Sequence, residues 1–290
     1  MNNIIIMKIT IIGIGLIGGS LAIDLRERGF ASHITGVDNN PAHVNIALER
    51  GLIDEIATLE YGVDNADLVI ITTPVDTITE LLPVVLDRIT DQVVTDMGSA
   101  KYKIAECVKD HPKRENYVPS HPMTGTEYSG PGAAIPGLFD DKCTILCDTE
   151  DCSAHAVDMI KKMYSVLKMR IININSEHHD ISAAYVSHIS HISSFALALT
   201  VMDIEKDEKK IYNMAGGGFE STVRLAKSSS DMWVPIFEQN SDNVLTALNN
   251  YIDKLQVLKI HLKDKKTKEL HKMIKKSNRI GKILMNNSKK

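Results

Sequence analysis

Residues 8–18 read KITIIGIGLIG and decide the fold. The first five letters form an apolar, β-branched run typical of a buried parallel strand, and the stretch from Leu16 to Arg28 has the pattern of a helix. Gly13 and Gly15 lie in the turn between these elements and Gly18 lies in the first turn of the helix, with the spacing GxGxxG. In this strand–turn–helix context the glycines permit a tight turn, the approach of a pyrophosphate and close helix packing. The stretch therefore predicts a dinucleotide-binding domain.

The predicted second strand ends at Asp38, 20 residues after Gly18. A carboxylate there can accept hydrogen bonds from an adenosine ribose and would repel a 2′-phosphate, which favours NAD over NADP. A Walker sequence is absent, which argues against a nucleoside triphosphatase. The residues that we expect to bind NAD come from the glycine loop and the ends of the second and third predicted strands: Gly13, Gly15, Leu16, Ile17, Gly18, Asp38, Thr73 and Pro74.

Strand and helix patterns alternate up to about residue 175, and only helix patterns follow. Alternation of this kind is typical of βαβ units and a mostly parallel sheet. We therefore predict an α/β protein with a Rossmann domain over residues 1–175 and an all-helical domain for substrate binding and dimerisation over 176–290. The predicted strands are Lys8–Ile12, Ile34–Asp38, Leu68–Thr73, Gln92–Asp96, Tyr117–Ser120, Thr144–Asp148 and Arg170–Asn175; the predicted helices after them include His178–Met202, Gly218–Ser228, Asp231–Gln239 and Asp242–Leu262.

The composition is that of an ordinary globular protein: 290 residues, 43% hydrophobic, with a formal net charge of −4. The charge is unevenly distributed, because residues 255–290 carry a net +10 and the rest carries −14. We interpret the basic segment as a C-terminal helix whose charged side chains face water, and we expect no nucleic-acid partner.

The apolar stretch from Ile4 to Leu25 has the hydropathy of a signal anchor. It also contains Lys8, Asp24 and four glycines, which suit a buried strand followed by a helix. The four cysteines form no CxxC pair and are interpreted as reduced thiols. We therefore expect a cytoplasmic protein that does not insert in a membrane.

Three clusters of polar residues are candidates for chemistry. The first is SHPMTGTEYSG at 120–130, which follows a predicted strand. Ligands bind at the carboxyl ends of strands in open α/β sheets, and a histidine there can accept a proton near neutral pH. His121 is therefore a candidate general base, although a lone histidine is more often structural.

The second cluster is HHDISAAYVSHISH at 178–191, in which His188 and His191 share one helical face. We considered a metal site, but the HExxH pattern and a suitably placed cysteine pair are absent, so no metal is predicted. The third cluster is GFESTVRLAK at 218–227, followed by Asp231-Met232-Trp233. Arg224 lies there in a mostly apolar segment, where it pairs with an acid such as Glu220 or clamps a substrate carboxylate.

Together the three clusters resemble the prephenate dehydrogenase family, through the patterns HPMTGTExSG, HDxxxAxVSHxxH and GFxxxxRxAxS followed by MW. The resemblance runs from Lys8 to about Leu262, with the motifs in the family's order. It implies the NAD-dependent oxidative decarboxylation of prephenate, a step of tyrosine biosynthesis: a hydride leaves C4 of the ring, the C4 hydroxyl loses its proton, and CO₂ departs as the ring becomes aromatic.

The resemblance also implies roles for particular residues. His121 would accept the hydroxyl proton, and Ser99 would hydrogen-bond the same hydroxyl and help to align His121. Arg224 would hold the ring carboxylate. The residues that would line the rest of the substrate site are Thr126, Glu127, His188, His191 and Trp233.

Two alternatives remain open at this point: an arogenate dehydrogenase acting on the amino analogue, and a non-catalytic regulator that binds NAD. We expect a homodimer, because apolar positions such as Ile189, Phe195 and Leu199 form a stripe on the helical domain. Any feedback inhibition by tyrosine is expected to act at or near the active site.

Overall fold

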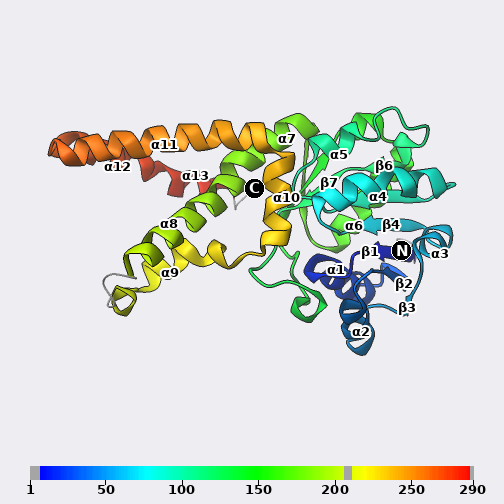
Figure 1. Cartoon of the computed structure of the whole chain (residues 1–290). Coiled ribbons are helices and arrows are strands. Elements are labelled where there is room, and N and C mark those ends of the chain that lie inside the picture. Colours follow the sequence, from blue (N-terminus) through cyan, green and yellow to red (C-terminus); the bar gives the residue numbers. More distant parts are fainter. Residues whose placement is uncertain (1–6, 206–210, 288–290) are drawn as a thin grey trace. The chain divides into compact units, whose positions relative to one another are not determined.

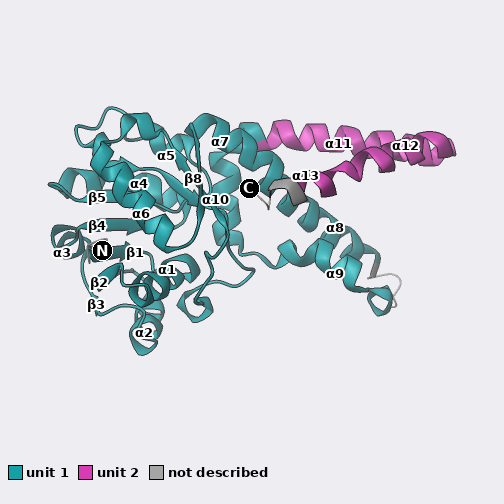
Figure 2. Ribbon diagram, turned by 180° about the vertical axis from the view of Figure 1, so that it is seen from behind, with its two compact units in different colours: residues 1–243 teal, residues 244–290 magenta. Residues whose placement is uncertain are grey.

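The structure is a computed structural model that describes residues 7–205 and 211–287. Residues 4–6 of the apolar N-terminal stretch and 288–290 of the basic segment lie outside the described residues. The chain divides into two compact units, residues 1–243 and residues 244–290 (Figure 2). The candidate site belongs entirely to the first unit, and the predicted boundary near residue 175 stays a prediction.

The main sheet of the first unit has six parallel strands in the order β3-β2-β1-β4-β5-β6 (Figure 1). This is the strand order of a doubly wound dinucleotide-binding fold, whose crevice lies where the order reverses, between β1 and β4. The predicted Rossmann architecture is confirmed. The strands are β1 (Met7–Ile12), β2 (Ala31–Val37), β3 (Glu55–Ile56), β4 (Leu68–Ile71), β5 (Val93–Asp96) and β6 (Tyr117–Val118).

Helices cover both faces of this sheet, and alternate residues of each strand pack into the hydrophobic core on one face or the other. In β4, Leu68 and Ile70 pack with α1 and α6, whereas Val69 and Ile71 pack with α3 and α4. All four side chains are fully buried, as a parallel sheet between two helical layers requires. The helices are α1 (Leu16–Glu27), α2 (Pro41–Glu49), α3 (Leu59–Asp64), α4 (Val75–Arg88), α5 (Tyr102–Glu106) and α6 (Ala154–Val166).

A second sheet of three strands differs from the sequence-based expectation of one continuous parallel series. It contains β7 (Ser120–Pro122), β8 (Cys143–Cys147) and β9 (Arg170–Ile174), with β7 antiparallel to β8. Pro119 separates β6 from β7, and since proline has no amide hydrogen the ladder of the main sheet cannot continue through it. His121 therefore lies within a strand, opposite Ile145, and not on a loop beyond one.

Within the described residues, only helices follow β9, as predicted. The expected helix over 178–202 is present as α7 (Ser176–Ala183), a π-helical turn (Ala184–His188) and α8 (Ile189–Glu205), and Asn175 caps its start by accepting the amide of His178. Such π-turns are frequent at functional sites. The remaining helices are α9 (Gly217–Val223), a 3₁₀ turn (Arg224–Lys227), α10 (Ser230–Gln239), α11 (Ser241–Lys263), α12 (Thr267–Ser277) and α13 (Arg279–Asn287).

The continuous helical stretch Ser176–Ile204 is long and apolar enough, by length and composition, to cross a membrane. Its N-terminal half, however, carries His179, Asp180 and His188, which are buried within the first unit. The apolar side chains near its C-terminal end are exposed, among them Leu199 and Met202. The stretch thus combines buried polar side chains near its start with exposed apolar side chains near its end.

Candidate active site

A cavity of about 490 Å³ opens at the glycine loop, at the reversal point of the main sheet. Five of the residues that the sequence pattern selects for NAD line this cavity: Gly13, Gly15, Asp38, Thr73 and Pro74. Gly13 has φ +92°, a conformation that favours glycine. The lining residues are Ile12, Gly13, Gly15, Val37, Asp38, Asn39, Asn40, His43, Leu59, Thr72, Thr73, Pro74, Thr77 and Leu81.

Leu16, Ile17 and Gly18 do not line the cavity and instead open α1 behind it. Gly18 packs so closely that a Cβ there would lie 2.3 Å from the carbonyl oxygen of Gly13. Its lack of a side chain therefore lets the helix start directly beneath the turn. Sequence reasoning missed Asn39, Asn40, His43 and Thr77, which reach the cavity because they follow Asp38 or Pro74 in the chain.

Two features of the cavity fit a dinucleotide. The side chain of Asp38 is only 8% exposed, and its oxygens accept the amides of Ile14 and Asn40 at 2.8 Å each. Oδ2 also lies 3.5 Å from Nδ1 of His43, whereas Oδ1 keeps a lone pair that a ribose hydroxyl can use. The hydroxyl of Thr73 is buried without a hydrogen-bond partner among the described residues, and a polar group of a bound dinucleotide would satisfy it.

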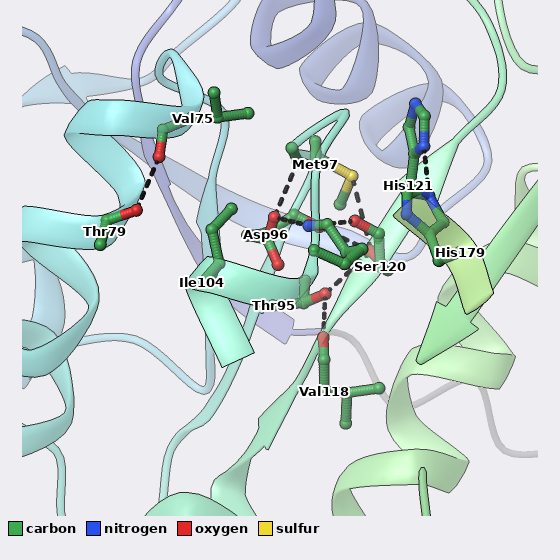
Figure 3. Close-up of polar contacts among 12 residues, drawn as sticks. Val75, Thr79, Thr95, Asp96, Met97, Ile104, Val118, Ser120, His121 and His179 are labelled. Carbon is green, nitrogen blue, oxygen red and sulfur yellow. Dashed lines mark hydrogen bonds and ion pairs between the residues drawn. The ribbon is translucent and has the colours of Figure 1, made fainter. Parts of the chain in front are cut away.

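His121 belongs to a chain of buried side chains that the sequence did not reveal. Its Nδ1 lies 2.8 Å from Nε2 of His179, whose own Nδ1 lies 2.7 Å from a carboxylate oxygen of Asp180 (Figure 3 shows the two rings). A carboxylate accepts, so His179 must carry its proton on Nδ1 and accept at Nε2. His121 then donates from Nδ1, and its Nε2 is left with a free lone pair.

Burial holds the pKa of His121 well below its usual value, and the neighbouring His179, Lys101 and His188 act in the same direction. The ring is therefore neutral near pH 7. A neutral imidazole with a defined free nitrogen is the form required of a general base.

A second buried network supports the strand that carries His121. Lys101 forms an ion pair with Asp96 at the end of β5, and its Nζ also donates to the backbone oxygen of Ser120, at 3.0 Å. The phenol of Tyr117 donates to the other oxygen of Asp96 at 2.6 Å. Both partners of the ion pair are fully buried, so the charges depend on each other and on these hydrogen bonds. The network joins β5 to β7 at Ser120, the residue before His121, and Figure 3 shows Asp96 and Ser120 beside the His121 ring.

Ser99 follows β5 and is half-buried. No side chain among the described residues hydrogen-bonds its hydroxyl, and His121 is held by His179 instead. The Ser99 backbone lies against the ring of His188. The assignment of Ser99 to a substrate hydroxyl stays a prediction.

His188 lies behind the site, fully buried, with Nδ1 3.2 Å from the amide nitrogen of Asn240. The same amide donates to the backbone oxygen of Asp180 at 2.8 Å. Burial lowers the pKa of His188 to about 4, so it is also neutral. In this structure His188 supports α7 and the ring of Trp233, and its predicted contact with substrate stays a prediction.

The third cluster forms a second wall. His191 stacks on Trp233 with ring centroids 3.5 Å apart, and its Nδ1 donates to the backbone oxygen of Ser187. Arg224 is half-exposed and pairs with Glu127 at 3.6 Å, not with Glu220. Burial lowers the pKa of His191, and the positive charge of Arg224 contributes to this shift. The structure thus brings together four predicted substrate residues from three separate segments, with Thr126 next to Glu127 on the loop.

No group of three or more His, Cys, Asp or Glu side chains suited to a metal ion occurs within residues 7–205 and 211–287. The fold, the glycine-loop cavity and the neutral histidine define a class of protein, the dehydrogenases that use a dinucleotide.

Family models match nearly the whole chain: "Prephenate dehydrogenase, nucleotide-binding domain" over residues 21–173 and "Prephenate dehydrogenase, dimerization domain" over residues 175–276. The chain belongs to the prephenate dehydrogenase family. It is 30% identical over 275 residues to the prephenate dehydrogenase of Bacillus subtilis, covering 93% of this chain and 74% of the relative.

Solved structures agree with this assignment. A prephenate dehydrogenase from Aquifex aeolicus, crystallised with hydroxyphenyl propionate and NAD⁺, is 31% identical and superposes with a TM-score of 0.86 over 94% of this chain and 96% of that one. The arogenate dehydrogenase of Synechocystis is 28% identical, with a TM-score of 0.75 over 94% of this chain and 98% of that one.

Proposed function

We propose that the protein catalyses the NAD-dependent oxidative decarboxylation of prephenate to 4-hydroxyphenylpyruvate and CO₂, as a step of tyrosine biosynthesis. Family membership supports the reaction and its substrate. The observation that carries the mechanism is the buried, neutral His121, whose Nδ1 is occupied by His179 and whose Nε2 is free.

His121 acts as the general base. Its Nε2 accepts the proton of the C4 hydroxyl as that carbon is oxidised, and the low pKa of the ring keeps this nitrogen unprotonated before the reaction. The breaking of the bond between C1 and its carboxylate then releases CO₂ and makes the ring aromatic. Aromatisation supplies driving force, so the protein's main tasks are to orient the substrate and to remove the proton.

NAD⁺, when bound, supplies the oxidising equivalent as the acceptor of a hydride. The residues that line the cavity would hold it: the loop at Gly13 and Gly15 would bind the pyrophosphate and Asp38 the ribose, with Thr73 and Pro74 completing the lining. The carboxylate of Asp38 also selects against a 2′-phosphate.

Arg224 holds the ring carboxylate of prephenate. Its present partner, Glu127, is 20% exposed, and a bidentate substrate carboxylate is a stronger partner than an ion pair at 3.6 Å. His191 and Trp233 form the adjoining wall, where the buried indole N–H has no acceptor among the described residues. Ser99, Thr126 and His188 complete the proposed substrate site.

The protein acts as a cytoplasmic homodimer. The second family model is described as a dimerization domain, and α8 carries the exposed apolar side chains Leu199, Met202 and Ile204. A twin subunit would remove this apolar surface from water. The four cysteines are free, as expected in a reducing compartment.

The reaction is tested by mixing the purified protein with prephenate and NAD⁺ and following the absorbance of NADH, with arogenate and NADP⁺ in parallel. We expect fastest turnover with prephenate and NAD⁺, and 4-hydroxyphenylpyruvate as the product. Turnover with arogenate and not with prephenate would mean that the proposed mechanism holds but that the substrate is arogenate. The absence of NADH with both substrates would contradict the proposal.

A further inference from the structure

His179 and Asp180 are buried to 1% and 2% exposure, yet the predicted site leaves them without a role. They stand directly behind His121, on the side away from its free Nε2, in the order His121–His179–Asp180. The first hydrogen bond of this chain, at 2.8 Å, joins β7 to α7 across 58 residues of sequence, and the second, at 2.7 Å, lies within α7.

The carboxylate of Asp180 is itself held in a defined orientation. It accepts the backbone amides of Lys101 at 2.8 Å and Tyr102 at 3.0 Å, while Asn240 donates to its backbone oxygen. Contacts from three elements therefore fix its position: the segment that opens α5, the helix α7, and the end of α10. Such an anchor costs little further ordering when charge develops beside it.

The groups around His121 make a positive charge on its ring costly. The titratable and charged groups that face it are His179 from α7, Lys101 from the segment before α5, and His188 from the π-turn. All three are basic, and Asp96, the nearest acid of the neighbouring network, is already paired with Lys101. Asp180, one ring further away, carries the negative charge that can compensate a proton taken up by His121.

We propose that His179 and Asp180 are positioning residues that hold His121 with its proton on Nδ1 and stabilise the imidazolium formed during turnover. This inference rests on the proposed function. The O–H bond of the substrate breaks, a new N–H bond forms at Nε2 of His121, and the positive charge is shared through the Nδ1–H···Nε2 hydrogen bond with a ring polarised by the Asp180 carboxylate. The arrangement follows the logic of a carboxylate that orients a catalytic histidine, with a second imidazole inserted between them.

Three substitutions test the relay. His179→Leu removes the acceptor for Nδ1 of His121, whereas His179→Gln provides an amide oxygen at a similar reach. Asp180→Asn keeps the shape and removes the charge. We expect His179→Leu and Asp180→Asn to lower kcat by roughly 10- to 100-fold with little change in the KM for prephenate, and His179→Gln to recover much of the loss.

The pH profile separates this role from a purely structural one. Without the negative charge of Asp180, protonation of His121 becomes harder, so the acidic limb of kcat/KM moves to lower pH in Asp180→Asn. His178→Gln is the matched control, because His178 is the exposed neighbour on the same helix and its ring hydrogen-bonds Asn175, away from the His121–His179–Asp180 chain. We expect its kcat and pH profile to match the wild type.

Nitrogen-15 NMR of the histidine rings gives a readout that needs no turnover. The wild-type protein should show His121 protonated at Nδ1, and His179→Leu should redistribute the proton between both nitrogens. An unchanged tautomer in His179→Leu, or wild-type kcat and pH profile in Asp180→Asn, would overturn the relay. If wild-type protein does not oxidise prephenate, the proposed function fails, and the tautomer still reports separately on the His121–His179 pair. The Asp180 carboxylate also accepts the amides of Lys101 and Tyr102, which open α5. If Asp180→Asn does not fold for this reason, the comparison of His179→Leu with His179→Gln still tests the relay.

Discussion

The carboxylate of Asp38 accepts the backbone amide of Ile14 at 2.8 Å, joining the end of β2 to the middle of the glycine loop. This hydrogen bond places the acidic group beside the glycine turn that lines the cavity. The residue that we propose to select the cofactor therefore also holds the loop that we propose to bind it. A substitution at Asp38 can therefore alter both the cofactor preference and the conformation of the glycine loop.

Asp38→Ser combined with Asn39→Arg should move the cofactor preference toward NADP. The serine removes the charge that repels a 2′-phosphate, and Asn39 lines the cavity, where an arginine can pair with that phosphate. The ratio of kcat/KM for NADP⁺ and NAD⁺ measures the effect. Since the hydrogen bond to Ile14 is also lost, Asp38→Ser alone is the control. Unchanged selectivity for NAD⁺ in the double variant would remove Asp38 from the ribose contact.

His121→Asn should lower kcat at least about 100-fold with little change in KM for prephenate, as expected for a lost general base. The asparagine is too short and too weakly basic to take the proton at the position of Nε2. Steady-state rates at saturating prephenate and NAD⁺ check this. A variant that keeps more than a tenth of the wild-type kcat would show that another group removes the proton.

Arg224→Ala should mainly raise the KM for prephenate, by about 10- to 100-fold, because the guanidinium is proposed to hold the ring carboxylate. Arg224→Lys keeps the charge but not the bidentate geometry, so its KM for prephenate should lie between those of the wild type and Arg224→Ala. If the KM for prephenate stays at the wild-type value in Arg224→Ala, the carboxylate lies elsewhere. The KM for NAD⁺ serves as the internal reference, since Arg224 does not line the dinucleotide cavity.

Acidification should destabilise the folded protein below about pH 6.5. Burial lowers the pKa of His121 and brings that of His188 to about 4, so below 6.5 the unfolded chain binds protons that the folded protein does not. Each such histidine reduces the free energy of unfolding by up to about 1.4 kcal/mol per pH unit, until the pH reaches its folded-state pKa.

Urea denaturation between pH 7 and pH 5 measures this slope. His188→Gln should flatten the slope, whatever its effect on stability at pH 7, and the exposed His178→Gln should leave the slope as in the wild type. An identical slope in all three proteins would mean that His188 is not held neutral by the fold.

Leu199→Glu should weaken the homodimer, because Leu199 is 60% exposed on the apolar part of α8. A charge buried at an apolar interface without a partner is costly. Light scattering at micromolar concentration should show a dimer for the wild type and a smaller mass for the variant. Val84→Glu is the control, since Val84 is 52% exposed on α4, a helix that packs on the Rossmann sheet. A wild-type protein of monomeric mass would contradict the proposal.

Local pattern was sufficient for much of the molecule. The glycine spacing after an apolar strand predicted the turn, the cavity and the place of Asp38, because each of these depends on residues adjacent in sequence or on neighbouring strands. The change to helices after Ile174 was likewise visible in the loss of the β pattern. The separate sheet of β7, β8 and β9 was not, since which strands pair is decided by contacts over long sequence distances.

The sequence by itself determined the class of fold, the dinucleotide loop and, through its motifs, the set of residues available for chemistry. Only the tertiary structure decided how they are joined: His121 hydrogen-bonds His179 across 58 residues, and Arg224 pairs with Glu127 instead of Glu220. The physical reason is that helical and strand periodicities act over a few residues, whereas a buried polar group must find its hydrogen-bond partner wherever the packed core places one.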